Sequence, residues 1–195
     1  MTDYKILDDV LSIEQADEIE ALLTAVSFPW YCTNRFSTVD EPNYDDSNIF
    51  EYLQFVHLFC DWDEGKTTVN SRYYNQIANI INPLCDGDKI VRIKANYKTQ
   101  CRSGTEDMHT TPHIDMRLQQ DGSPDGFRVE FPHTVIIYYV NDSDGDTFLF
   151  NSNGTEMTRV EPKKGRFLIF DGQIYHAGSF PIHHLDRIVI NYNIE

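Results

Sequence analysis

Two histidines and one aspartate carry side chains that could bind a metal ion together. His113 and Asp115 stand two positions apart, so on a β-strand both would project from the same face. A second imidazole would come from His176, on a distant strand. Two imidazoles and a carboxylate make up the 2-His-1-carboxylate triad, whose open coordination positions suit non-haem Fe(II). The sequence therefore predicts an iron site.

A second His-x-Asp sequence, formed by His184 and Asp186, shows that this spacing alone does not identify the site. The two pairs differ in the residues that come later in the chain. A further histidine and then Arg187 come after the first pair, whereas no histidine comes after the second. A site at the second pair would have to recruit His109 or His113 from upstream. We therefore favour the first pair.

Arg187 adds a group that binds carboxylates, eleven residues after His176. The planar guanidinium of arginine can hold a carboxylate through two parallel hydrogen bonds. A metal triad beside such a clamp is the combination that a 2-oxoglutarate-dependent oxygenase requires. Taken singly, each of these residues would be an ordinary surface or core residue, so the prediction rests on the ordered set.

Length and composition indicate the class of protein. A chain of 195 residues and 22.7 kDa, with 41% hydrophobic and 13% aromatic residues, predicts one globular domain over residues 1–195. A domain of this size buries about 70% of its unfolded surface. The widely spaced cysteines predict reduced thiols rather than a disulfide framework or a zinc site. They are Cys32, Cys60, Cys85 and Cys101.

The charge balance bears on partners and location. The chain has 16 basic and 31 acidic residues and a formal net charge of −15. That charge opposes binding to nucleic acid or to an anionic membrane surface. The first ten residues show no charged-then-apolar signal, and no apolar run reaches membrane-spanning length. We expect a cytoplasmic protein with no nucleic-acid and no membrane partner.

The N-terminal segment predicts a strand followed by a helix. Residues 4–7 have the composition of a short strand, and Ser12 with Gln15 forms a capping box at the start of the helix. The helix carries one apolar stripe, which predicts a packing face. The stripe consists of Ile13, Ala16, Ile19, Leu22 and Leu23.

The next part of the chain predicts further scaffold. Residues 51–60 predict a strand, and residues 71–84 predict a helix that Pro83 breaks. Residues 28–48 lack periodicity and are rich in Pro, Asn, Asp and aromatic residues. They form either an ordinary surface loop, which we favour, or part of a substrate-facing lid.

Residues 89–97 alternate Ile, Val and Ile with charged residues, as a half-buried strand does. A polar connection follows at residues 98–111. Within it, His109 has the spacing of a helical metal pair with the histidine four residues later, but Pro112 argues against a helix there. We expect His109 to lie in a loop. Arg117 shares the expected strand face of the His-x-Asp pair and either lines the opening of the site or lies on the surface.

From Tyr97 to the C-terminus, about half of the chain, the sequence resembles the prolyl 4-hydroxylase-like branch of the Fe(II)/2-oxoglutarate oxygenases. Each matching segment is weak alone, but seven of them stand in the order found in that family. They are residues 93–97, 113–115, 135–141, 145–150, 161–170, 176–178 and Arg187.

The resemblance and the strand pattern imply the fold. We expect a mainly β (α+β) protein with N-terminal helices, in which two antiparallel sheets form a double-stranded β-helix, or jelly roll, flanked by helices. Residues 1–88 would supply helical and strand support and a possible lid. Residues 89–195 would form the jelly-roll core with the metal site, since no helix-length pattern occurs after residue 84.

The resemblance also implies the chemistry. Fe(II) would be held by His113, Asp115 and His176, with 2-oxoglutarate and O2 as co-substrates and ascorbate as a candidate reductant. Arg187 would hold the far carboxylate of 2-oxoglutarate. Tyr139 matches a family tyrosine that assists there, and Tyr97 matches one that faces the cofactor pocket; packing in the core is the alternative for each. A carboxylate as third ligand favours hydroxylation over halogenation, because related halogenases lack it.

The substrate that the resemblance implies is a proline in a peptide or protein, as for a compact hydroxylase of bacterial or phage type acting in the (host) cytoplasm. Two positions depart from the family, since Asn191 and Asn193 stand where prolyl hydroxylases often carry a hydroxyl residue and a tryptophan. A small molecule or another protein side chain is therefore the alternative substrate. A cupin-like protein that binds a metal or a small molecule without redox chemistry is the alternative of another class.

Overall fold

The computed structural model describes residues 4–33, 53–63, 66–85, 88–102, 104, 106–119, 127–129 and 132–195. Most of the predicted loop or lid at residues 28–48 lies outside the described residues. The elements, in chain order, are β1 (Tyr4–Leu7), α1 (Ile13–Thr24), β2 (Tyr31–Thr33), β3 (Gln54–Asp63), β4 (Lys66–Val69), α2 (Tyr74–Ala78), the 3-10 helix η2 (Asn79–Ile81), β5 (Ile90–Thr99), β6 (Arg117–Gln119), β7 (Phe127–Val129), β8 (Thr134–Tyr139), β9 (Thr147–Phe150), β10 (Glu156–Val160), β11 (Phe167–Asp171), β12 (Tyr175–Gly178) and β13 (Asp186–Ile194).

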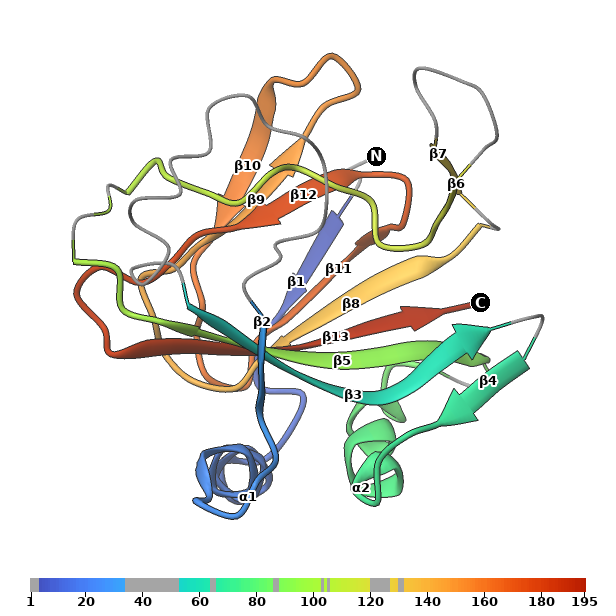
Figure 1. Cartoon of the computed structure of the whole chain (residues 1–195), viewed down its shortest axis with the longest axis vertical. Coiled ribbons are helices and arrows are strands. Elements are labelled where there is room, and N and C mark those ends of the chain that lie inside the picture. The colour runs from blue at the N-terminus through green and yellow to red at the C-terminus, as the bar shows by residue number, and fades with distance from the viewer. Residues whose placement is uncertain are drawn as a thin grey trace.

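The described strands pair antiparallel and form a large sheet, a small sheet and a hairpin (Figure 1). The large sheet has the strand order β1-β11-β8-β13-β5-β3-β2, and β4 pairs with β3. The small sheet has the order β10-β9-β12 and lies on the opposite side of the large sheet from both helices. This arrangement is the jelly roll that the sequence predicts, with its helices on one outer face.

The central strand β13 is buried on both faces, and its sequence alternates accordingly. One face carries apolar side chains that pack on the helix side: Ile188, Ile190, Tyr192 and Ile194. The other face looks toward the small sheet and carries Arg187, Val189, Asn191 and Asn193, because successive side chains of a strand point to opposite sides. Three of these four residues are polar and buried. Because burying polar groups is costly unless they have partners, this face is a candidate for a binding site.

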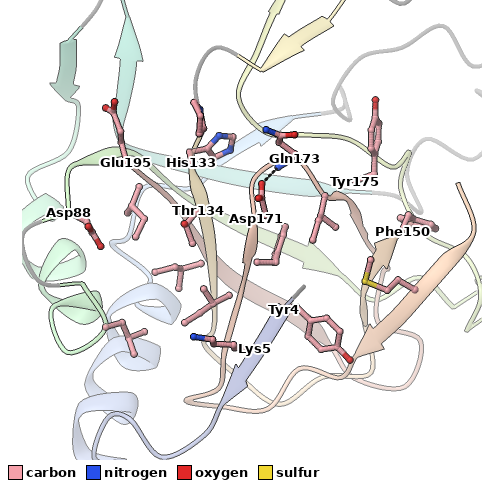
Figure 2. Close-up of a pocket in the computed structure, with 18 of the residues that line it drawn as sticks. Tyr4, Lys5, Asp88, His133, Thr134, Phe150, Asp171, Gln173, Tyr175 and Glu195 are labelled. Atoms are coloured by element: carbon pink, nitrogen blue, oxygen red, sulfur yellow. Dashed lines mark hydrogen bonds between the residues drawn. The ribbon is translucent and has the colours of Figure 1, made fainter. Parts of the chain in front are cut away.

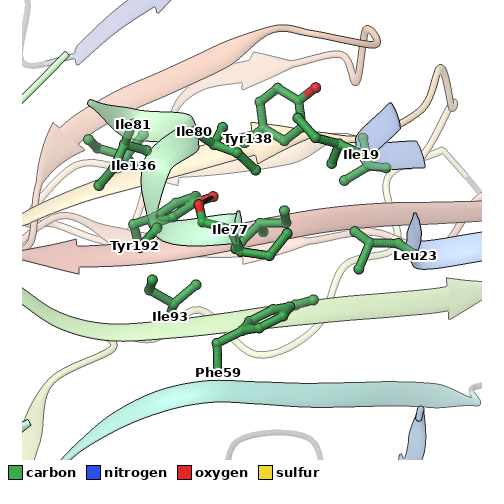
Figure 3. Packing of buried hydrophobic residues seen from close by; sticks show 14 of the residues in the cluster. Ile19, Leu23, Phe59, Ile77, Ile80, Ile81, Ile93, Ile136, Tyr138 and Tyr192 are labelled. Atoms are coloured by element: carbon green, nitrogen blue, oxygen red, sulfur yellow. Dashed lines mark hydrogen bonds between the residues drawn. The ribbon is translucent and has the colours of Figure 1, made fainter. Parts of the chain in front are cut away.

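The main core lies between the large sheet and the helices (Figure 3). Ile19 and Leu23 of α1 and Ile77 of α2 pack on Phe59 of β3 and Tyr192 of β13. The Tyr192 hydroxyl donates to the Ile77 carbonyl at 2.9 Å, so the one polar atom of this side chain is satisfied. A second cluster, which includes Leu149 of β9, fills the space between the two sheets.

The predicted capping box at the start of α1 is confirmed. The Gln15 amide donates to the Ser12 hydroxyl at 3.2 Å, and the Ser12 amide donates to the Gln15 side chain at 2.9 Å. The predicted stripe is right except at its first position, since Ala16, Ile19 and Leu23 are buried but Ile13 is 77% exposed. Ile13 is the first helical residue.

We expect Ser12→Ala to lower the free energy of unfolding by about 1 kcal/mol, because an amide at the helix start loses its acceptor. Urea denaturation of the two proteins measures the difference. The exposed Ser27, just after the helix, offers the matched control, and Ser27→Ala should leave the midpoint unchanged. Equal midpoints for Ser12→Ala and wild type would contradict the capping role.

The helix predicted over residues 71–84 is much shorter in the structure. It consists of α2 and η2 and ends at Ile81, since Pro83 cannot continue the hydrogen-bond pattern. Within the described residues, neither helix is long and apolar enough to cross a membrane.

Candidate active site

The predicted metal ligands meet at the edge of the small sheet. His176 lies on β12, and its backbone pairs with that of His113 through two hydrogen bonds of 2.9 Å. The structure corrects one detail, because His113 forms an isolated bridge and Asp115 lies in a bend rather than in a strand.

The three side chains converge on one point. Their candidate ligand atoms all lie within 4.8 Å of one another. Nε2 of His113 is 3.7 Å from Oδ1 of Asp115, and Nε2 of His176 is 3.6 Å from Oδ2. Nδ1 of each imidazole faces a backbone carbonyl, that of Thr111 at 3.1 Å and that of Ile174 at 3.2 Å. These carbonyls accept the ring proton, so both Nε2 lone pairs face the centre, as metal ligation requires.

Burial and neighbouring charges shift the pKa values of two members of the triad in the direction that favours binding of a cation. Burial lowers the pKa of His176 to about 4, although Asp115 opposes this shift, so the imidazole is neutral near neutral pH. Burial raises the pKa of Asp115, but interactions with His176, His113 and Arg92, including a hydrogen bond from His113, outweigh burial and hold this pKa well below its usual value. Two imidazoles and one carboxylate form a donor set that fits Fe(II).

Two asparagines of β13 position the carboxylate. Nδ2 of Asn191 and Nδ2 of Asn193 donate to the same oxygen, Oδ2 of Asp115, at 2.8 and 3.2 Å. Oδ1 is left for a metal ion. The sequence singled out these asparagines only as departures from the family pattern. Their spacing on one strand face was the signal that they could act together.

We expect Asn193→Ala to weaken Fe(II) binding by about 10- to 100-fold, because the ligand loses a group that fixes its orientation. Anaerobic metal titration measures the affinity, and far-UV circular dichroism checks the fold. Asn75→Ala, at an exposed helical position, is the control. Unchanged metal affinity in Asn193→Ala would show that the hydrogen bond to Asp115 does not matter for binding.

A cavity of about 340 Å³ extends from the triad along the large sheet to Arg187. The Arg187 side chain is buried, and it donates to the Gly145 carbonyl at 2.5 Å and to the Thr147 hydroxyl at 2.8 Å. A Cβ on Gly145 would lie 2.7 Å from Cδ of Arg187, and a Cβ on Gly178 would lie 3.3 Å from its guanidinium. Both glycines therefore make room for the arginine.

Lys98 lies beside Arg187 and was not predicted from the sequence to be a site residue. The two residues pair across β5 and β13, and the buried Lys98 ammonium donates to the Gly178 carbonyl at 2.6 Å. In the described part of the chain, neither cation forms an ion pair. Burial and the charge of Arg187 lower the pKa of Lys98 well below its ordinary value. Two adjacent buried cations without an anion make a fitting site for a carboxylate.

The two predicted tyrosines differ in position. The Tyr139 hydroxyl donates to Thr147 at 2.7 Å, the same hydroxyl that binds Arg187, so Tyr139 reaches the clamp through Thr147. Tyr97 lies on the other face of β5, where it packs on Trp30 and donates to Asp186 at 2.9 Å. Tyr97 therefore does not line the described cavity, contrary to the expectation that it faces the cofactor pocket.

Other histidines lie apart from the triad. The His109 ring packs on Phe148 and bridges to Ser179 through its backbone, so it is a loop residue as expected. His184 lies 3.1 Å from Asp144, whereas Asp186 binds Tyr97, so the second His-x-Asp sequence does not form a site. Arg117 begins β6, and its side chain lies outside the described atoms.

A second hollow, of about 1110 Å³, is lined by residues of β1, β8 and β11 (Figure 2). Tyr4 and Lys5 of β1, Thr134 of β8 and Glu195 after β13 contribute to its wall. Among the described residues, no member of the triad lines it. The hollow is therefore separate from the candidate active site.

The sequence matches no family model and no curated protein. The structure is similar to an oxidoreductase of the 2OG-Fe(II) oxygenase family from Burkholderia pseudomallei, with a TM-score of 0.67, 11% identity and coverage of 99% of this chain and 85% of that one. The chain has the fold of the 2-oxoglutarate–Fe(II) oxygenases. This bears out the fold class and the resemblance that the sequence indicates.

Two further structures share this fold but differ in what they bind. A prolyl hydroxylase from Trichoplax adhaerens, in complex with a hypoxia inducible factor peptide, has a TM-score of 0.62 and 13% identity over 100% of this chain and 84% of that one. HygX from Streptomyces hygroscopicus, with nickel, 2-oxoglutarate and hygromycin B bound, has a TM-score of 0.55 and 12% identity over 99% and 82%. The fold thus hosts both a peptide and a small molecule.

Proposed function

We propose that this protein is an Fe(II)- and 2-oxoglutarate-dependent dioxygenase that hydroxylates a C–H bond, folded as one domain over residues 1–195. The observation that carries the proposal is the pairing of a convergent His113–Asp115–His176 triad with two buried cations in one cavity. Arg187 and Lys98 would hold the far carboxylate of 2-oxoglutarate. A cupin-like binder gives no reason for burying these two charges.

Each residue has a role that its contacts support. His113, Asp115 and His176 would hold Fe(II), which when bound couples the conversion of 2-oxoglutarate and O2 to succinate and CO2 with transfer of one oxygen atom to the substrate C–H bond. Asn191 and Asn193 keep Oδ1 of the aspartate directed at the metal position.

The first candidate substrate is a proline in a peptide, hydroxylated at C4. The similarity to the Trichoplax prolyl hydroxylase supports it, whereas the HygX structure supports a small molecule as the alternative. The test incubates the protein with Fe(II), 2-oxoglutarate, ascorbate and a panel of proline-containing peptides, amino acids and nucleosides, and measures succinate release and product mass. A hydroxylated proline is the expected product. Turnover confined to the small molecules would overturn the proline assignment and keep the dioxygenase.

A further inference from the structure

The active-site cavity carries a charge opposite to that of the whole protein. The chain has a formal net charge of −15. Among the described residues that line the cavity, one is acidic, Asp115, and four are basic: Arg92, Lys94, Lys98 and Arg187. Basic side chains gathered in a cleft raise the local concentration of anions. The charge pattern therefore points to anionic ligands.

Three of the four basic residues lie on one face of β5. Arg92, Lys94 and Lys98 alternate along this strand with apolar residues that face the helices. Lys98 pairs with Arg187 across β13, whereas Lys94 pairs with Asn191, which binds the metal ligand Asp115. The cavity thus has one cationic end at Arg187 and Lys98 and a second cation at Lys94, on the β5 side of the triad.

Among the basic residues that line the cavity, Lys94 is the one that has no hydrogen-bond or ion-pair partner in the described part of the chain and no role in holding 2-oxoglutarate. Arg187 and Lys98 would hold the far carboxylate of 2-oxoglutarate, and Nε of Arg92 lies 3.5 Å from Asp61. Lys94 is half-buried and, within the described part of the chain, has neither a hydrogen bond nor an ion pair. Burial and the charge of Arg92 lower its pKa to about 8, although the charges of Asp115 and Asp61 oppose this shift. An ammonium in this position gains most from an anion that arrives with a ligand.

A buried acceptor beside Lys94 is also unsatisfied. Nδ2 of Asn191 must face Asp115, since a carboxylate only accepts, and this fixes the orientation of the amide. Oδ1 of Asn191 is then buried with no hydrogen-bond partner among the described residues. A buried acceptor that lacks a donor costs about 1–3 kcal/mol. The unsatisfied Oδ1 of Asn191, close to Lys94, therefore indicates a ligand that carries a hydroxyl or N–H group next to its anionic group.

We infer that the substrate is an anion whose carboxylate or phosphate group pairs with Lys94 and whose neighbouring hydroxyl or N–H donates to Asn191, an inference that rests on the proposed function. In a peptide substrate the anion is an acidic side chain or a terminal carboxylate beside the hydroxylated residue. In a small-molecule substrate it is an acid or a phosphate ester. Lys94 is the residue that selects for it.

The experiment uses the full chain loaded with Co(II) and saturated with 2-oxoglutarate. Binding is detected by NMR, because the paramagnetic Co(II) broadens the signals of any small probe molecule that binds close to it. Methyl phosphate and acetate are the anionic probes, and trimethyl phosphate and acetamide are their neutral counterparts. The variants are Lys94→Met, Lys94→Arg and, as a charge-matched control at an exposed position of β4, Lys66→Met. The visible spectrum of Co(II) shows separately whether 2-oxoglutarate has bound.

We expect saturable broadening of at least one anion and of neither neutral probe. Lys94→Met should raise the half-saturating concentration about tenfold or more, while Lys94→Arg and Lys66→Met stay close to wild type. The anion that responds distinguishes a phosphate from a carboxylate substrate. Equal broadening in wild type and Lys94→Met, or none in wild type, overturns the inference while 2-oxoglutarate still binds. A Co(II) spectrum that 2-oxoglutarate leaves unchanged overturns the proposed function instead.

Discussion

His176→Ala is expected to abolish the visible metal-to-ligand charge-transfer band that Fe(II) and 2-oxoglutarate give together under anaerobic conditions. The imidazole of His176 supplies one of three ligand atoms that lie within 4.8 Å of one another. Two ligands cannot complete the facial arrangement that the triad provides. Hydroxylation should fall below detection, since no step of the reaction proceeds without the metal.

The control for this variant is His183→Ala, at an exposed position seven residues along the chain. It removes an imidazole of the same kind and should leave the band at full intensity. Thermal unfolding of both variants without metal checks that neither has lost the fold. A full band in His176→Ala would mean that the metal binds elsewhere, and the triad would have to be abandoned.

The sequence indicated the ligands better than it indicated the backbone that carries them. The order of His113, Asp115, His176 and Arg187 was enough to place them in one site, because the fold brings distant strands together. The local expectation was wrong, since His113 and Asp115 do not share a strand. Their convergence comes from the bridge to β12 and from the bend after it, both of which depend on tertiary contacts.

The two faces of β5 show where sequence reasoning falls short. Its alternation predicted a half-buried strand, and such a pattern suggests charged residues in water. In the structure the charged face lines the cavity instead, so Lys94 and Lys98 belong to the site. The same alternation places Tyr97 with Ile93 on the helix side. The two-residue alternation was visible in the sequence. That the small sheet lies over the polar face of β5 could be seen only in the structure.

Arg187→Met is expected to raise the dissociation constant for 2-oxoglutarate strongly while Fe(II) still binds. Removing one partner of a buried, hydrogen-bonded charge pair costs about 2–5 kcal/mol. That range corresponds to a loss of affinity of about 30- to 4,000-fold. An anaerobic titration that monitors the charge-transfer band measures it directly. Arg72→Met removes an exposed guanidinium and should leave the titration unchanged.

Gly145→Ala separates the position of this guanidinium from its charge. The new Cβ would lie 2.7 Å from Cδ of Arg187, so the side chain must move although its charge remains. If the clamp works by geometry, 2-oxoglutarate binding weakens in Gly145→Ala as well, by less than in Arg187→Met. If Gly145→Ala binds 2-oxoglutarate as tightly as wild type does, the exact position of the Arg187 guanidinium does not matter for binding. Lys98 would then be the residue that positions the carboxylate.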